Sequence, residues 1–356
     1  MIKKKKTTKG EEKKKSAVFR RSFFVFLSGA IFLLLIIHIY TLLYSPPKKE
    51  KISKIITIQE GASFYNVARL LEAEGLISSR RFFVLLGRGF GADRRIKAGE
   101  YSLNTAMLPL DVLDIIKNGK VYHHKIIIPE GYSIRQIGRL LEEEGLVDFK
   151  DYGALVHNKD FIQAFGIDGP SLEGYIFPET YFFAKNQGLE EIISSMIAKF
   201  FSVYTPEFEN RARQLGMTMR EVLTLASIIE RETGAEEEMP AVSAVYHNRL
   251  KKNMPLQSDP TVIYGIKNFN GNITKRDLQA KTPYNTYRIK GLPPGPIANP
   301  GRRAIYAALY PANVPYLYFV SKNNGRHHFS TDLKEHNKAV WKYQVSPYRK
   351  NKTLNP

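Results

Sequence analysis

Residues 58–76 read IQEGASFYNVARLLEAEGL, and residues 128–146 repeat that pattern without a gap as IPEGYSIRQIGRLLEEEGL. β-Branched residues stand just before each Glu-Gly pair and indicate a strand. The Glu-Gly-x-Ser sequence predicts a turn and then a helix with a serine N-cap, at Ser63 and at Ser133. The repeated unit is therefore predicted to be a strand, a turn and an amphipathic helix.

Glycines mark the predicted ends of these helices, at Gly75 and Gly145, because helices often end at a residue with left-handed backbone. Between the two copies, the pattern predicts a strand at 100–103 and a helix near 109–117, again ended by Gly119. A duplicated unit of this size has two interpretations. It serves either as a packing scaffold or as a module that binds carbohydrate or a protein partner.

The N-terminal part of the chain predicts a membrane anchor. Residues 1–21 are rich in lysine and arginine, and residues 22–44 form an apolar run. About 20 apolar residues cross a bilayer core, and the positive-inside rule then places the N-terminus in the cytoplasm and the rest of the chain outside. A cleaved signal peptide is the alternative, but its apolar run is shorter, and the TLLYSPP that ends this run is a poor cleavage site. A polar linker is predicted at residues 45–54.

The chain is basic and lacks cysteine. Its 356 residues carry a formal net charge of +19, and the absence of cysteine excludes disulfides, thiolate metal sites and a cysteine nucleophile. The charge favours an anionic partner, but much of it lies in the cytoplasmic tail, where it orients the anchor and meets anionic lipid head groups. Because the aromatic-basic patterns of RNA-binding modules are missing from the sequence, nucleic acid is not an expected partner.

The character of the sequence changes near residue 150, where longer helical patterns mix with loops. We predict a duplicated region at 55–150, a mixed helical and strand domain at 151–345 and a C-terminal tail at 346–356. Helices and strands do not alternate regularly, so the predicted fold class is α+β, preceded by a single transmembrane helix. A strand is predicted at 315–321, and helices are predicted at 189–202, 206–215, 218–233, 240–251, 301–309 and 332–344.

Two glutamates, Glu230 and Glu232, interrupt the apolar helix predicted at 218–233. The helical period places them on opposite flanks of its apolar stripe, so they cannot share one role. Glutamates at the border of such a stripe usually extend into water. The functional alternative is a half-buried carboxyl group that gives and takes a proton. Periodicity alone does not choose between the two side chains.

Polar loops rich in Pro, Gly, Asn and Tyr follow this helix, as expected of loops that carry function. They read YHNRL (246–250), PLQSDPTVIYG (255–265), TPYNTYRIKGLPPGPIANPG (282–301) and GRHHFSTDLKEHN (325–337). Their side chains are of the kinds that stack on sugar rings and form hydrogen bonds with them, which favours a sugar-binding cleft. Upstream, LEGYIFPETYFF at 172–183 is rich in aromatic residues, and if it is a buried strand, Glu173 and Glu179 need partners.

These motifs resemble those of the endolytic murein transglycosylase (YceG-like) family, on the stretches LEGYIFPETY, ASIIERET, YHNRL, LQSDPTVIYG and YNTYRIKGLPPGPIANPG. The resemblance extends from the anchor to about residue 342. It implies that the duplicated units are LysM-like and that 151–345 is the catalytic domain. It also implies a bacterial inner-membrane protein with an extracytoplasmic catalytic domain, peptidoglycan glycan strands as substrate, and peptidoglycan synthases as partners.

By this resemblance the catalytic residue is Glu230, and the reaction breaks the β-1,4 bond between N-acetylmuramic acid and N-acetylglucosamine within nascent strands. The 6-hydroxyl of the muramic acid acts as nucleophile and leaves a 1,6-anhydro end, so one carboxyl group suffices where glycosidases need two. That carboxyl must arrive protonated, which requires a pKa raised by burial. No cofactor or metal is expected, and the histidines at 327, 328 and 336 are interpreted as structural.

The residues expected to position the substrate come from the polar loops. They are Gln257, Ser258, Asp259, Thr261, Tyr264, Tyr284, Asn285, Tyr287 and Asn299. Asp259 has a structural alternative, because Ser-Asp-Pro initiates turns and the aspartate could cap a following helix. His247 is interpreted as a hydrogen-bonded, half-buried side chain rather than a base, and Glu232 as a structural residue.

Two rival functions stay open at this stage. A muramidase-type hydrolase would use Glu230 as the acid and Asp259 as the second carboxylate. A non-enzymatic cell-wall adaptor of the synthesis machinery would bind glycan or synthesis proteins through the repeats. The products separate these functions, because hydrolysis adds a water that the anhydro product lacks.

Overall fold

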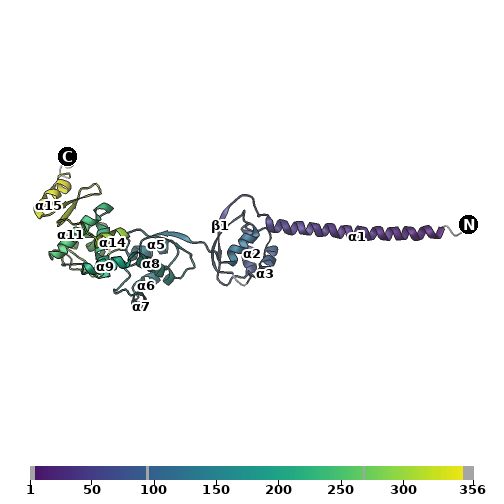
Figure 1. Cartoon of the computed structure of the whole chain (residues 1–356), viewed down its shortest axis with the longest axis horizontal. Helices are drawn as coiled ribbons and strands as arrows, with labels where there is room; N and C mark the ends of the chain where they lie inside the picture. The colour runs from purple at the N-terminus through teal and green to yellow at the C-terminus, as the bar shows by residue number, and fades with distance from the viewer. Residues whose placement is uncertain (1–4, 94–95, 268, 348–356) are drawn as a thin grey trace. The chain divides into compact units, whose positions relative to one another are not determined.

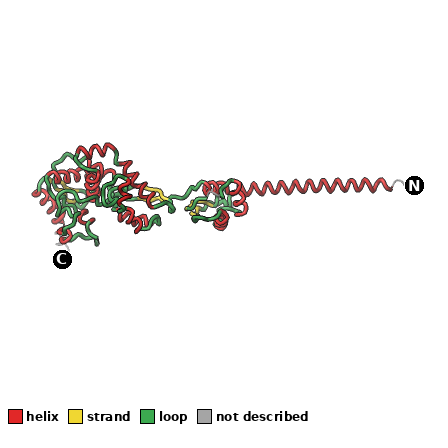
Figure 2. Tube along the Cα trace, turned by 90° about the horizontal axis from the view of Figure 1, so that it is seen from below, coloured by secondary structure: helices red, strands yellow, loops and turns green. Residues whose placement is uncertain are grey.

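The computed structural model describes residues 5–93, 96–267 and 269–347 (Figure 1). The chain divides into two compact units, which are described separately. The first comprises Met1–His123 with Ala184–Asn186, and the second comprises His124–Phe183 with Gln187–Pro356. Helices and loops make up most of the chain, and the described strands form antiparallel pairs (Figure 2). The mixed α+β class predicted from the sequence is confirmed.

The first unit begins with helix α1, Lys5–Tyr44. Its segment Ala17–Tyr44 has a mean hydropathy of 2.5 and is not buried within the protein. At a rise of about 1.5 Å per residue, this segment is longer than the ~30 Å hydrocarbon core of a bilayer. The helix is therefore long and apolar enough to cross a membrane. Residues 1–4 of the predicted cytoplasmic tail lie outside the described residues.

The first copy of the repeat folds as a pair of helices between two paired strands. Strand β1 pairs antiparallel with β2, so that Ser53 faces Asn104. Ser63 caps α2 by accepting a hydrogen bond of 3.2 Å from the Asn66 N–H. The elements of this copy and the helix after it are β1 (Ser53–Ile58), α2 (Phe64–Ala73), α3 (Arg80–Gly89), β2 (Gly99–Asn104) and α4 (Pro109–Lys117).

The second copy lies in the second unit and places three helices, rather than two, between its paired strands. Its helix α5 begins with a capping box, in which the Ser133 hydroxyl accepts from the Gln136 N–H and the Gln136 side chain accepts from the Ser133 N–H. Gly75 and Gly145 end the equivalent helices with φ of 69° and 68°. The elements are β3 (His124–Ile127), α5 (Ile134–Glu143), α6 (Phe149–Leu155), α7 (Lys159–Ala164) and β4 (Thr180–Phe183), with β3 and β4 antiparallel.

The rest of the second unit is mainly helical, and each helix predicted there begins within one residue of its expected start. Of the stretch 315–321, only 318–321 forms a strand. The sequence did not predict the short helix α13 or strand β6, and it indicated helix α12 only in the alternative that Asp259 caps a following helix. The elements are α8 (Leu189–Val203), α9 (Pro206–Gln214), α10 (Met219–Glu232), η1 (Glu236–Glu238), α11 (Met239–Lys251), α12 (Asp259–Tyr264), α13 (Lys275–Gln279), α14 (Arg302–Leu309), β5 (Tyr318–Ser321), β6 (His327–Ser330), α15 (Leu333–Val340) and the π-helical turn η2 (Trp341–Val345).

The two copies of the repeat contribute to different cores. In the first copy, Leu71 and Phe83 belong to a cluster confined to the first unit. In the second copy, Ile137 and Leu141 are buried in the same cluster as Leu225 of α10. Packing therefore joins the second copy to the helices that follow it. The domain boundaries predicted at residues 54, 150 and 345 stay a prediction, and residues 348–356 of the predicted tail lie outside the described residues.

Candidate active site

Helix α10 carries Glu230 and Glu232, the two glutamates that interrupt its apolar sequence. It starts with a capping box between Thr218 and Glu221, and every residue from Val222 to Ile229 is buried. The buried hydroxyl of Ser227 is hydrogen-bonded: it donates to the Thr224 carbonyl and accepts from the Ile297 N–H at 3.0 Å. The buried body of this helix holds its last turn in place.

Glu230 lies on that last turn, half-buried against the start of α14. Its Oε2 accepts a hydrogen bond of 2.9 Å from the main-chain N–H of Gly301, the N-cap residue of α14. Burial raises the pKa of Glu230 to about 6, against the opposing effect of the Gly301 hydrogen bond. The charge of Glu130 raises this pKa further and that of Arg231 lowers it. The carboxyl group is therefore able to carry a proton at mildly acidic pH.

The turn of the second repeat forms one wall of this region. The Gly131 N–H donates to the Asn299 carbonyl and the Asn299 N–H donates to the Tyr132 carbonyl, both at 2.9 Å. Gly131 has a φ of 75°, which favours glycine. A β-carbon on Gly301 would overlap the carboxyl group of Glu130. The Glu130 side chain thus reaches the residue whose N–H holds Glu230.

Glu232 lies in different surroundings, as its position on the opposite flank predicted. Its Oε1 accepts a hydrogen bond of 2.8 Å from the Tyr246 hydroxyl and another from the Ser258 hydroxyl. Burial raises its pKa, and the two hydrogen bonds oppose that effect. Glu232 therefore ties α10 to α11 and to the loop before α12.

The QSDPTV stretch leads into α12. Gln257 is exposed with a φ of 51°, and its N–H donates to the Thr286 carbonyl at 3.1 Å. Ser258, not Asp259, is the N-cap residue of α12, so the alternative that the aspartate caps this helix is wrong. The Asp259 Oδ1 instead accepts a hydrogen bond of 2.7 Å from the Tyr287 hydroxyl.

Buried polar residues connect this stretch to the YNTY motif. The Thr261 hydroxyl donates to the Ser258 carbonyl at 2.7 Å and lies 2.8 Å from the Thr286 hydroxyl. The Asn285 side chain donates to the Ala280 carbonyl at 2.7 Å. Ser258, Thr261 and Asn285 are each 0% exposed. Ser258 and Thr261 join the two loops through Thr286, and Asn285 ties the YNTY motif to the end of α13.

A second buried carboxyl group, Glu173, lies at the centre of another network. Its Oε1 accepts hydrogen bonds from the Ile134 N–H at 3.0 Å and from the Asn299 side chain at 3.1 Å. Its Oε2 accepts from the Tyr264 hydroxyl at 3.0 Å. Burial raises the pKa of Glu173 to about 8, and these hydrogen bonds lower it only in part. The Tyr284 ring packs against that of Tyr264 with centroids 4.9 Å apart.

The structure thus divides the predicted site residues among three neighbouring groups. Asn299 bonds both to the turn at Gly131 and to Glu173, while Tyr264 bonds to Glu173 and packs against Tyr284. Most of the others gather at the start of α12, namely Gln257, Ser258, Asp259, Thr261 and Tyr287, while the Asn285 side chain bonds to the end of α13. Sequence reasoning missed Glu130 and Gly301 as neighbours of Glu230. The signal for Glu130 was its place in the repeated Glu-Gly turn.

His327 and His247 each contact a residue that is distant in the sequence. His327 Nδ1 lies 2.8 Å from Glu238 Oε2, and His247 Nε2 lies 2.8 Å from the Ala308 carbonyl oxygen. Within residues 5–93, 96–267 and 269–347, no group of three or more His, Cys, Asp or Glu side chains is arranged to hold a metal ion.

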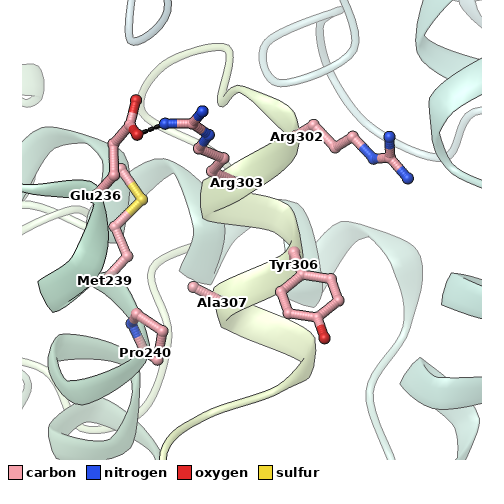
Figure 3. Close-up of a pocket in the computed structure, with 7 residues that line it drawn as sticks. All are labelled: Glu236, Met239, Pro240, Arg302, Arg303, Tyr306 and Ala307. Atoms are coloured by element: carbon pink, nitrogen blue, oxygen red, sulfur yellow. Dashed lines mark ion pairs between the residues drawn. The ribbon is translucent and has the colours of Figure 1, made fainter.

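A pocket of about 420 Å³ lies along α14, close to Gly301 in the sequence (Figure 3). Arg303 on α14 forms an ion pair with Glu236 across its edge. Its lining is otherwise largely apolar, and the full set is Glu236, Met239, Pro240, Arg302, Arg303, Tyr306 and Ala307.

The sequence of this chain matches a known protein family. Residues 56–342 match the YceG-like family, a range that includes both copies of the repeat and the whole region around Glu230. The chain belongs to the YceG-like family. The family match thus covers the turn at Glu130 as well as α10 and α14.

Proteins similar to this chain carry a name that states an activity. A Bacillus subtilis (strain 168) protein named endolytic murein transglycosylase is 34% identical over 326 residues, covering 87% of this chain and 90% of the relative. A Streptococcus pneumoniae (serotype 2, strain D39) protein of the same name is 28% identical and matches 80% of this chain but 57% of its own length. The crystal structure of a YceG-like protein from Listeria monocytogenes shares 32% identity, with a TM-score of 0.56 over 82% of this chain and all of that one.

Proposed function

We propose that this protein is an endolytic peptidoglycan lytic transglycosylase. It cleaves the β-1,4 bond between N-acetylmuramic acid and N-acetylglucosamine within nascent glycan strands. The relatives named endolytic murein transglycosylase support this assignment. The observation that carries it in the structure is Glu230, a half-buried carboxyl group held by the start of another helix, with a pKa raised to about 6.

The chemistry needs one carboxyl group in two roles. Protonated Glu230 donates its proton to the bridging oxygen as the glycosidic bond breaks, and N-acetylglucosamine leaves with a free hydroxyl. The 6-hydroxyl of the muramic acid then attacks its own anomeric carbon, and ionised Glu230 takes the hydroxyl proton. The 1,6-anhydro bond forms, the carboxyl regains its proton, and no water is consumed.

The surroundings of Glu230 suit this cycle. Burial favours the protonated form and the Gly301 N–H stabilises the ionised form, so the two states lie close in free energy near pH 6. Because Gly301 holds Oε2, we assign proton transfer to Oε1. A general acid works best when its pKa is near the working pH.

We assign the predicted binding residues to two roles. Exposed Gln257 and Asp259, with Tyr287, Tyr264 and Tyr284, present side chains suited to sugar hydroxyls and ring faces. The buried members act indirectly, because their polar atoms already bond within the protein and position the loops; these are Ser258, Thr261, Asn285 and Asn299.

The apolar segment of α1 fits a single-pass anchor. We propose that it lies in the bacterial inner membrane with the basic N-terminus in the cytoplasm, so that the catalytic part meets peptidoglycan outside. We further propose that the two strand–helix copies are LysM-like units. Association with peptidoglycan synthases is a further proposal that rests on the family resemblance.

Digestion of purified glycan strands, followed by mass spectrometry, tests the assignment. The expected products carry 1,6-anhydro-muramic ends and come from within strands. Products heavier by one water would instead identify a muramidase-type hydrolase. Intact strands after prolonged incubation, together with tight glycan binding, would identify a non-enzymatic adaptor.

A further inference from the structure

The Glu-Gly turn occurs twice in the chain, but its two copies have different surroundings. Gly61 and Gly131 adopt the same backbone conformation, with φ of 74° and 75°. A β-carbon added at Gly61 would meet no atom within 4 Å. One added at Gly131 would lie 3.4 Å from Glu230 Cγ and 3.3 Å from Arg231 Cδ. The second turn is therefore built against the catalytic helix, whereas the first is open.

Main-chain hydrogen bonds hold the second turn in that place. Gly131 and Tyr132 exchange bonds of 2.9 Å with Asn299, two residues before Gly301. Arg231 Nη1 also approaches the Gly131 carbonyl oxygen at 3.4 Å. These contacts come from α10 and from the loop before α14, the two segments that form the surroundings of Glu230.

The second turn places the side chain of Glu130 next to Gly301. Its carboxyl group lies against the α-carbon of Gly301, in the space that any larger residue would fill. Gly301 is also the residue whose N–H holds Glu230. We propose that Glu130 is a second carboxylate of the active site, a positioning residue that acts on Glu230 through its charge and through its packing against Gly301. This inference rests on the proposed transglycosylase function.

Charged groups near Glu230 act on its pKa in opposite directions. From its own helix, Arg231 favours the ionised form of Glu230, and from the turn, Glu130 opposes it. On α14, Arg303 is paired with Glu236. Glu130 is solvent-exposed, so water screens its charge and its effect on the Glu230 pKa is limited. Glu130 thereby helps Glu230 to keep the proton that bond cleavage requires.

The test is a pH profile of kcat/KM for the full-length protein in detergent, acting on purified glycan strands. Four forms are compared: wild type, Glu130→Gln, Glu130→Asp and Glu60→Gln. Glu60 is the equivalent residue in the first turn and provides a matched control. In Glu130→Gln the alkaline limb moves to lower pH, with a roughly threefold loss of kcat/KM on that side and a smaller loss near pH 5. Glu130→Asp keeps the charge and recovers most of the wild-type profile, and Glu60→Gln follows wild type.

Thermal unfolding of each form shows that the comparison is between folded proteins. The inference is overturned if Glu130→Gln has the same alkaline limb as wild type and Glu60→Gln. It is also overturned if folded Glu130→Gln loses all activity, because Glu130 would then take part in the chemistry directly. If wild type itself releases no anhydro ends, the proposed function fails instead, so the two failures are distinguishable.

Discussion

The main-chain N–H of Gly301 donates a hydrogen bond of 2.9 Å to Oε2 of Glu230, joining the start of α14 to the last turn of α10. The bond stabilises the ionised carboxylate, while burial of the same group stabilises its protonated form. Burial prevails, and the pKa of Glu230 rises to about 6. A group balanced in this way can both give and take a proton.

The pH dependence of cleavage follows from that balance. Glu230 must be protonated to act as an acid, and its protonated fraction falls as pH rises through about 6. We therefore expect kcat/KM for release of anhydro ends to have an alkaline limb near that pH. Rates on purified strands at a series of pH values measure it. A profile that stays flat through this range would remove Glu230 from the acid role.

Replacing Glu230 with glutamine removes the transferable proton and preserves the shape of the side chain. We expect Glu230→Gln to lose about 10²–10⁴-fold in kcat or more, while its melting temperature stays close to that of wild type. Glu232→Gln is the matched control on the same helix. Its amide can still bond to Tyr246 and Ser258, so it should retain most of the activity. Equal losses in the two variants would argue against Glu230 as the specific catalyst.

Glu173 makes stability dependent on pH. Its pKa in the folded protein is about 8, above the ordinary value of 4.5, so the folded state keeps a proton that the unfolded chain loses at lower pH. Stability should fall as pH rises from about 4.5 to about 8. In Glu173→Gln the fall should be smaller, because the amide is neutral throughout. Melting temperatures across this range test the prediction, and parallel curves for the two proteins would contradict it.

Asn299 is predicted to stabilise the fold rather than to bind the substrate. Its Oδ1 accepts from the N–H groups of Gly174 and Ile176 at 2.9 and 3.0 Å, and its Nδ2 donates to Tyr132 and Glu173. Asn299→Ala leaves these buried groups without partners and should cost about 2–4 kcal/mol in the free energy of unfolding.

Gln257→Ala, at an exposed position, is the control for Asn299 and should change the free energy of unfolding by less than about 0.5 kcal/mol. Denaturant unfolding measures both variants. A mild effect of Asn299→Ala on stability with a large rise in KM would instead favour direct substrate binding.

The two Glu-Gly turns have the same backbone conformation, so equivalent glycine substitutions in them can be compared directly. Gly61→Ala and Gly131→Ala should each cost about 1 kcal/mol, since alanine disfavours positive φ at both positions. Gly131→Ala should in addition lower kcat/KM, because its methyl group presses on Glu230 and Arg231. Unfolding and kinetic measurements on both variants check this. Similar activities in the two variants would show that the packing of the second turn has no influence on catalysis.

Local features of the fold were predictable from the sequence. The serine caps at Ser63 and Ser133 and the glycine ends at Gly75 and Gly145 depend on neighbouring residues, and they appear in the structure as expected. The separation of Glu230 and Glu232 followed from the helical period. The short helix α13 was missed because its 5 residues are too few to show a helical period.

The sequence by itself determined the repeat, the long apolar helix and the helices around Glu230, and its family motif led to the proposal that Glu230 is the catalyst. The tertiary structure alone decided which repeat packs against α10, because Glu60 and Glu130 stand in nearly the same local sequence. It also decided that Glu130 and Gly301 meet at Glu230 and that Asn299 is fully buried. The physical reason is that periodicity and capping act over a few residues, whereas burial and the raised pKa of Glu230 depend on segments brought together from distant parts of the chain.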